Sequence, residues 1–146
     1  MEGPVLGLDF GERRIGLAVS DPAAVIAFPI GALDRQGLAK DVSALCDLIR
    51  ERGIVAVVVG LPLHLDGRAG TGAAAARRFA DALGAACALP VTLVDERMTT
   101  AIAERALREE PRGRGRGKRP AKQQVDAIAA ALILRTWLER PREGRA

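Results

Sequence analysis

The chain has few of the residues on which several common functions depend. It has no tyrosine, one tryptophan and three phenylalanines among 146 residues, so a platform of aromatic side chains for stacking bases is not expected. One histidine and two cysteines do not supply the ligand cluster of a zinc site. No apolar run approaches the roughly 20 residues of a membrane span, and the opening residues lack signal-peptide features. We therefore expect a cytoplasmic protein without a membrane partner.

The two cysteines are far apart in sequence. Cys46 and Cys87 lie in separate helical patterns and lack the close spacing of metal ligands. We predict that both are reduced thiols in the core of a cytoplasmic protein.

Positive charge is concentrated in one segment. The formal net charge is +4, and residues 111–122 hold six basic residues and no acid: Arg112, Arg114, Arg116, Lys118, Arg119 and Lys122. The rest of the chain is therefore mildly acidic. A local basic cluster on such a body indicates a polyanionic partner such as nucleic acid.

Hydrophobic periodicity predicts one α/β domain over residues 1–139. Period-2 and β-branched runs predict strands near residues 5–9, 15–20, 25–30, 54–59 and 90–96. Apolar residues at helical spacing predict helices near residues 37–52, 72–86, 99–110 and 122–139. The first three strands suit a meander, and the later alternation of strand and helix requires parallel crossovers. The prediction is a mixed five-stranded sheet flanked by helices, with a mobile basic loop at 111–121 and a disordered tail at 140–146.

The first strand ends on an acidic residue. Asp9 shares a strand face with Val5 and Gly7, and burial of a lone carboxylate costs several kcal/mol or more. Asp9 therefore needs a partner, unless it is an ordinary turn residue before Gly11.

Two further carboxylates stand at comparable places. Glu96 follows the last predicted strand, and Asp126 lies on the apolar stripe of the last predicted helix with Ile133 and Trp137. If that helix crosses the strand ends, three carboxylates converge and repel one another. Bound Mg²⁺ or Mn²⁺ would resolve the repulsion, and two such ions suit phosphodiester hydrolysis. The alternative for Asp126 is a buried ion pair with a nearby Lys or Arg, for which Lys122 is a candidate.

Several blocks of this sequence resemble one family. They are Gly7-Leu8-Asp9-Phe10-Gly11, Arg14-Ile15-Gly16-Leu17-Ala18-Val19-Ser20-Asp21, Gly60-Leu61-Pro62-Leu63, Asp66-Gly67, Asp95-Glu96-Arg97-Met98-Thr99-Thr100 and Asp126 before Ala129-Ala130-Ala131-Leu132-Ile133-Leu134. In this order, from about residue 5 to 138, they resemble the YqgF/RuvX family.

The resemblance implies a fold and an activity. It implies a ribonuclease H-like fold related to the junction resolvase RuvC, and a metal-dependent nuclease that processes the 5′ end of pre-16S rRNA. It also implies that Asp9, Glu96 and Asp126 form the acidic, metal-binding triad. Asp95 is a weaker candidate, because it occupies the opposite strand face from Glu96. His64 stands where many members have Asn, and we expect no catalytic role for it.

Basic residues near these carboxylates are candidates for binding nucleic acid. Arg13, Arg14 and Arg97 would contact flanking phosphates, as would the segment residues Arg112, Arg114, Arg116, Lys118 and Arg119. The alternative is a solvated turn for Arg13 and Arg14, and an ion pair with Asp95 for Arg97.

Other functions remain open at this point. The alternatives are a resolvase of four-way DNA junctions, acting as a monomer or homodimer, and a non-catalytic rRNA-binding factor in ribosome assembly. A kinase or ATPase of the actin-like class also opens with an Asp-x-Gly turn, but it needs two domains to close over ATP.

Overall fold

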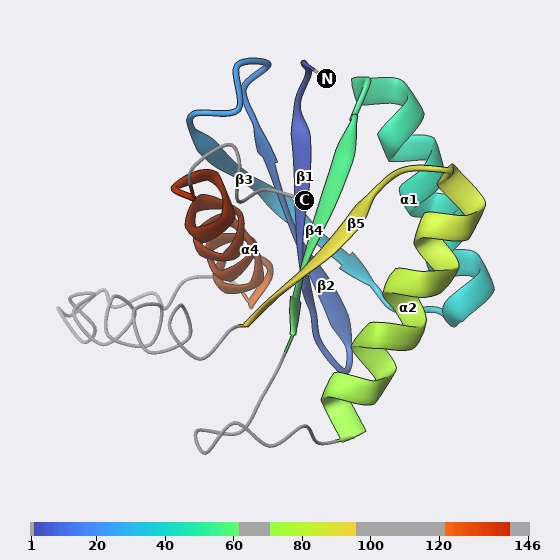
Figure 1. Cartoon of the computed structure of the whole chain (residues 1–146). Helices are drawn as coiled ribbons and strands as arrows, with labels where there is room; N and C mark the ends of the chain where they lie inside the picture. Colours follow the sequence, from blue (N-terminus) through green and yellow to red (C-terminus); the bar gives the residue numbers. More distant parts are fainter. Residues whose placement is uncertain (1, 62–70, 96–121, 141–146) are drawn as a thin grey trace, which may run out of the picture.

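The computed structural model describes residues 2–61, 71–95 and 122–140. In these ranges five strands form one mixed sheet in the order β3-β2-β1-β4-β5. Helix α4 covers one face of this sheet, and helices α1 and α2 cover the other (Figure 1). The predicted three-layer α/β architecture is confirmed.

The first three strands form the predicted meander. Strand β1 (Val5–Phe10) pairs antiparallel with β2 (Arg14–Ser20), and β2 pairs antiparallel with β3 (Ala27–Asp34). Strand β3 lies at the edge of the sheet, where Pro29 is tolerated because an edge strand has one unpaired side.

Strand β3 begins later and extends further than the sequence pattern predicts. The Asp21 carboxylate oxygen Oδ1 accepts hydrogen bonds from the backbone N–H groups of Val25 and Ile26, each at 2.7 Å. Because these two N–H groups are bonded within the turn, the segment joins the sheet only from Ala27 onward.

The second half of the sheet is built by parallel crossovers. Helix α1 (Leu38–Arg52) leads to β4 (Ala56–Leu61), and helix α2 (Thr71–Cys87) leads to β5 (Val91–Asp95). Strand β4 pairs parallel with both β1 and β5. Gly53 ends α1 in the left-handed conformation at φ 66°, the backbone state that glycine adopts at low cost.

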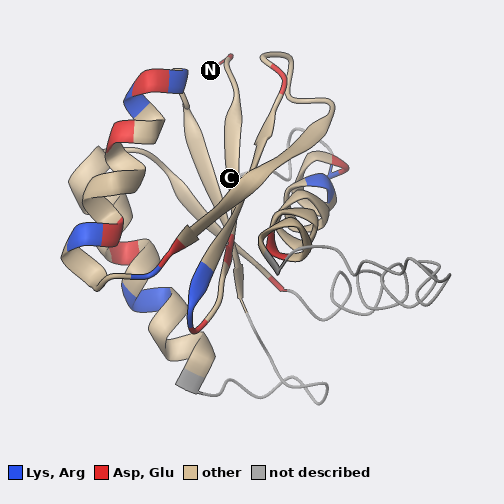
Figure 2. Ribbon diagram, turned by 180° about the vertical axis from the view of Figure 1, so that it is seen from behind, with Lys and Arg blue, Asp and Glu red and all other residues tan. Residues whose placement is uncertain are grey.

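Each sheet face has its own apolar core. The larger core lies under α1 and α2 and includes Leu6, Leu8 and Phe79. The smaller core lies under α4 (Lys122–Leu138) and includes Val58, Val94 and the helix residues Ala130, Ile133, Leu134, Trp137 and Leu138. Charge is concentrated on the helices, the turns and the strand ends, while most of the sheet is uncharged (Figure 2).

The prediction of two reduced thiols was wrong. Cys46 of α1 and Cys87 of α2 form a disulfide, with their Cα atoms 5.9 Å apart. The two cysteines lie 41 positions apart in sequence, so their proximity depends on how α1 and α2 pack side by side over the sheet. Neither helical pattern carries that information by itself.

Other expectations lie partly or wholly beyond the described residues. The predicted helix at 99–110, the basic loop at 111–121 and most of the tail at 140–146 fall outside them. No helix within the described ranges is long and apolar enough to cross a membrane.

Candidate active site

Asp9 lies near the end of the central strand, on the face that α4 covers. Val5 of the same strand belongs to the α4 core, and alternation along β1 puts Asp9 on the same side. Asp9 is paired across the sheet with Gly16 of β2 and Gly60 of β4. Because both neighbours are glycines, no side chain from β2 or β4 stands directly beside Asp9 on this sheet face.

Helix α4 is in direct contact with the strands through glycine. A Cβ atom built on Gly7 would lie 2.7 Å from Cβ of Leu134. A Cβ atom on Gly16 would overlap the backbone carbonyl of Asp126 and lie 3.1 Å from the Asp126 Cβ. The absence of side chains at these two positions therefore lets α4 lie directly on the strands, with its start against Gly16, the residue that pairs with Asp9.

Asp126 is held there by an ion pair. The Nε group of Arg14 donates a hydrogen bond to Oδ2 of Asp126 at 2.5 Å, and the two side chains are 24% and 23% exposed. The sequence left an ion pair open as the alternative for Asp126, and the structure contains one, with Arg14 as the partner. The carboxylate and the guanidinium come from positions 112 residues apart.

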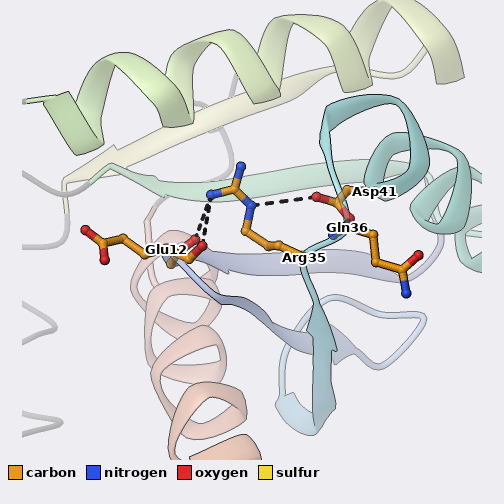
Figure 3. Close-up of polar contacts among 5 residues, drawn as sticks. Glu12, Arg35, Gln36 and Asp41 are labelled. Atoms are coloured by element: carbon orange, nitrogen blue, oxygen red, sulfur yellow. Dashed lines mark hydrogen bonds and ion pairs between the residues drawn. The ribbon is translucent and has the colours of Figure 1, made fainter.

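A second arginine holds the turn between β1 and β2. Arg35 follows β3 and reaches this turn, where its Nη1 group donates to the carbonyl oxygens of Gly11 at 3.2 Å and Glu12 at 3.4 Å (Figure 3). Its guanidinium lies 4.3 Å from the ring centroid of Phe10, a cation–π contact. The turn that follows Asp9 is therefore fixed by a side chain from outside the hairpin.

The Asp41 carboxylate lies beside the Arg35 guanidinium and helps to hold it in place. Asp41 is 2% exposed, and its Oδ2 atom lies 3.6 Å from Nε of Arg35, while its Oδ1 atom accepts a hydrogen bond from the backbone N–H of Gln36 at 2.9 Å. Burial of a carboxylate is costly unless it is paired, and the ion pair with Arg35 offsets part of that cost, since at 3.6 Å the two atoms attract each other without a hydrogen bond. Sequence reasoning missed both residues; the available signal was an acid at a position facing the core in the first turn of α1.

The structure separates Asp95 from Asp9. Asp95 is paired with Leu61, which belongs to the core under α1 and α2, whereas the preceding Val94 belongs to the α4 core. Asp95 is therefore on the opposite sheet face from Asp9, as strand alternation predicts. Arg13 lies exposed in the turn beside Arg14.

The remaining predicted site residues lie outside the described ranges. These are Glu96, Arg97, Arg112, Arg114, Arg116, Lys118, Arg119 and the non-catalytic His64. Their roles stay predictions from sequence.

The carboxylates at this end of the sheet suit a hard cation. Asp9 and Asp126 offer oxygen donors of the kind that Mg²⁺ and Mn²⁺ prefer. In residues 2–61, 71–95 and 122–140 no group of three or more acidic, cysteine or histidine residues is clustered as a metal site. A cation bound beside Asp9 and Asp126 would therefore need further ligands from elsewhere, such as water or substrate phosphate.

The sheet order, the carboxylate at the end of the central strand and the helix packed beside it define a ribonuclease H-like fold. Two solved structures share it: RuvC of T. thermophilus in complex with a Holliday junction substrate (16% identity, TM-score 0.54, 90% of this chain and 91% of that chain) and the large terminase nuclease of the thermophilic phage G20c (13% identity, TM-score 0.53, 92% and 82%). Over residues 3–140 the sequence matches the family described as "RuvX: Holliday junction resolvase". The chain belongs to this family.

Similar sequences are found in several bacteria. A protein of Chloroflexus aggregans is 44% identical over 140 residues, which cover 94% of each chain. A protein of Thermosynechococcus vestitus is 44% identical over 135 residues, 92% of this chain and 87% of the relative. Both carry the name "Putative pre-16S rRNA nuclease".

Proposed function

We propose that this protein is a divalent-metal-dependent nuclease that cuts phosphodiester bonds in structured RNA in the bacterial cytoplasm, with the 5′ end of pre-16S rRNA as its substrate. The observation that carries the proposal is the close packing of Asp126 onto Gly16, the residue paired with Asp9. This packing brings carboxylates from the first strand and the last helix to one end of the sheet. The activity in the names of the relatives supports the choice of RNA.

The residues have separate roles in this proposal. Asp9 and Asp126 hold the cation, and Glu96, one residue beyond the described end of β5, is the third carboxylate on sequence grounds. A divalent cation bound there would polarise the scissile phosphate and ease deprotonation of the attacking water. We expect one or two ions of Mg²⁺ or Mn²⁺.

The basic segment supplies affinity in this proposal. Each phosphate contact contributes a slope of about −0.7 to −0.9 to log K against log salt. The variant changes five residues of the segment to Ser: Arg112, Arg114, Arg116, Lys118 and Arg119. Its slope of log K against log salt should be flatter by up to roughly 4. An unchanged slope would mean that the segment does not contact the backbone of the nucleic acid.

A second candidate is the resolution of four-way DNA junctions, which the description of the matched family favours. Cleavage assays on a 5′-extended 16S rRNA precursor and on a four-way junction distinguish the two activities, each with Mn²⁺, with Mg²⁺ and with excess EDTA. Cleavage of the RNA alone supports our proposal, and cleavage of the junction alone supports the second candidate. Binding of the RNA without cleavage of either substrate would favour the non-catalytic assembly factor.

A matched pair of variants tests the site. Substitutions that only disturb support for metal ligands commonly cost 10–100-fold, so Asp9→Asn should lower the cleavage rate by at least about 100-fold. Asp81→Asn removes the same charge from an exposed position on α2, across the sheet from α4, and should leave the rate unchanged. Equal rates for the two variants, or full activity in EDTA, would refute the metal mechanism.

A further inference from the structure

The ion pair at Asp126 bears on how the proposed site is loaded, and the inference below rests on the proposed function. One of the two carboxylate oxygens of Asp126, Oδ2, already accepts a hydrogen bond from Nε of Arg14 at 2.5 Å. A guanidinium stays charged at any working pH. The carboxylate that is proposed as a metal ligand is therefore neutralised by the protein's own cation.

The position of Arg14 puts it beside the whole carboxylate site. It lies two residues before Gly16 on β2, so the two residues share a strand face. Gly16 is paired with Asp9 and carries the Asp126 backbone against it. The positive charge of Arg14 thus lies on the sheet face that carries Asp9, where it offsets the negative charge of Asp126 while no metal is bound.

Arg14 has fewer polar partners than Arg35. Among the described residues its guanidinium has one polar contact, the Nε bond to Asp126, although the two arginine side chains are similarly exposed, at 24% and 28%. Arg35 instead has two carbonyl oxygens, an aromatic ring and a buried carboxylate around it. Rotation of the Arg14 side chain away from Asp126 therefore breaks one polar contact among the described residues.

We propose that Arg14 is the resident counter-ion of Asp126, that a divalent cation displaces it, and that the released guanidinium then binds a phosphate oxygen of the nucleic acid. Arg is suited to both partners, because its planar fork matches carboxylate and phosphate geometry alike. The two binding events are thereby coupled. Metal frees Arg14 for the phosphate, and a phosphate on Arg14 frees Asp126 for the metal, as reciprocity of coupled binding requires.

The first test measures binding of Mn²⁺ to the protein without nucleic acid, by the EPR signal of the free ion. Arg14→Gln should lower the Kd for Mn²⁺ by at least about 5-fold relative to Arg13→Gln, the low end of typical coupling between sites. Arg13 is the matched control, because it removes the same charge from an exposed neighbouring side chain. Arg14→Lys should return the Kd toward that of the unchanged protein, since it restores a competing cation.

Two outcomes separate this inference from the proposed function. If Arg14→Gln and Arg13→Gln bind Mn²⁺ equally while Asp9→Asn and Asp126→Asn bind it more weakly, the counter-ion role of Arg14 is refuted and the metal site stands. If neither Asp variant weakens binding, the proposed metal site is refuted and the inference falls with it. Circular dichroism of each variant establishes that it is folded before titration.

The second test measures the phosphate half of the proposal. Fluorescence anisotropy measures binding of a four-way DNA junction and of an rRNA fragment, each with and without Ca²⁺. Ca²⁺ is chosen because it takes the same oxygen ligands. Gels establish that neither probe is cut. Ca²⁺ should tighten binding of the nucleic acid by at least about 5-fold more for the unchanged protein than for Arg14→Gln. Equal gains would show that the displaced guanidinium does not take up a phosphate.

Discussion

Substitution of Gly16 by Ala should disturb the site without removing any functional group. A Cβ atom at this position would overlap the backbone carbonyl of Asp126, and a backbone atom cannot rotate away as the tip of a side chain can. To bring the Asp126 oxygen from 2.0 Å to an ordinary contact distance of 3.4 Å, the start of α4 must move outward by about 1.4 Å. That movement carries Asp126 away from the strand end that holds Asp9.

The magnitude follows from two opposing terms. Overpacking of a close contact costs about 1–3 kcal/mol, and replacing Gly by Ala returns about 0.4–1 kcal/mol by restricting the unfolded chain. The free energy of unfolding should therefore fall by about 1–2 kcal/mol, which corresponds to a melting temperature lower by about 2–8 °C for a chain of this size. A displacement of about 1 Å can cost about 100-fold in rate, so activity should fall far more than stability.

The assay compares cleavage rates and thermal melts of three proteins at a temperature where all are folded. Gly84→Ala is the control: its Cβ would meet the Val91 side chain at 3.3 Å, and Ala is the better residue inside helix α2. It should match the unchanged protein in rate, because α2 covers the sheet face opposite to α4 (Figure 1). If Gly16→Ala retains full activity, the placement of Asp126 by close helix packing is not what assembles the site.

Three further measurements test other contacts. Hydrogen bonds from the backbone N–H groups of Ile26 and Val25 lower the pKa of Asp21. The stability that the Asp21 carboxylate adds is therefore present above its ordinary pKa of 3.8 and is lost as the pH falls below that value. The difference in melting temperature between the unchanged protein and Asp21→Asn should shrink from pH 5 to pH 2, and a constant difference would contradict this. Thiol titration of the denatured, unreduced protein should find no free thiol from Cys46 or Cys87, and two titratable thiols would contradict the disulfide. Reduction should lower the free energy of unfolding by up to about 4 kcal/mol for a separation of 41 residues. Asp41→Asn leaves the Arg35 guanidinium without its charged partner and should cost about 1–3 kcal/mol in urea unfolding, whereas a cost near zero would mean that the pair does not hold the turn.

Local sequence patterns were enough to predict most of the elements. Helix α1 was predictable because its apolar residues recur at helical spacing and Gly53 ends it. Strand β4 was predictable because its run of valines suits burial on both faces. The predicted start of strand β3 was less accurate, because the hydrogen bonds to Asp21 that keep residues 25 and 26 out of the sheet depend on the geometry of the turn.

Part of the candidate site was also visible in the sequence. Asp9 at a strand end and Asp126 on an apolar helical stripe are both costly placements for a carboxylate, and that cost marks them without any knowledge of the fold. Sequence left open whether Asp126 serves a metal or an arginine. Only the packed structure shows that Arg14 reaches it.

The sequence by itself determined which segments are strands and helices, because periodicity and capping act between residues a few positions apart. The tertiary structure alone decided the partners across long separations: Arg14 with Asp126, Arg35 with the carbonyl oxygens of Gly11 and Glu12, and Cys46 with Cys87. Such contacts depend on how closely helices approach the sheet and on the register of the strands, as the fit of Asp126 against Gly16 illustrates. These quantities are set by the sum of many weak packing contacts over the whole domain, and no short stretch of sequence contains that sum.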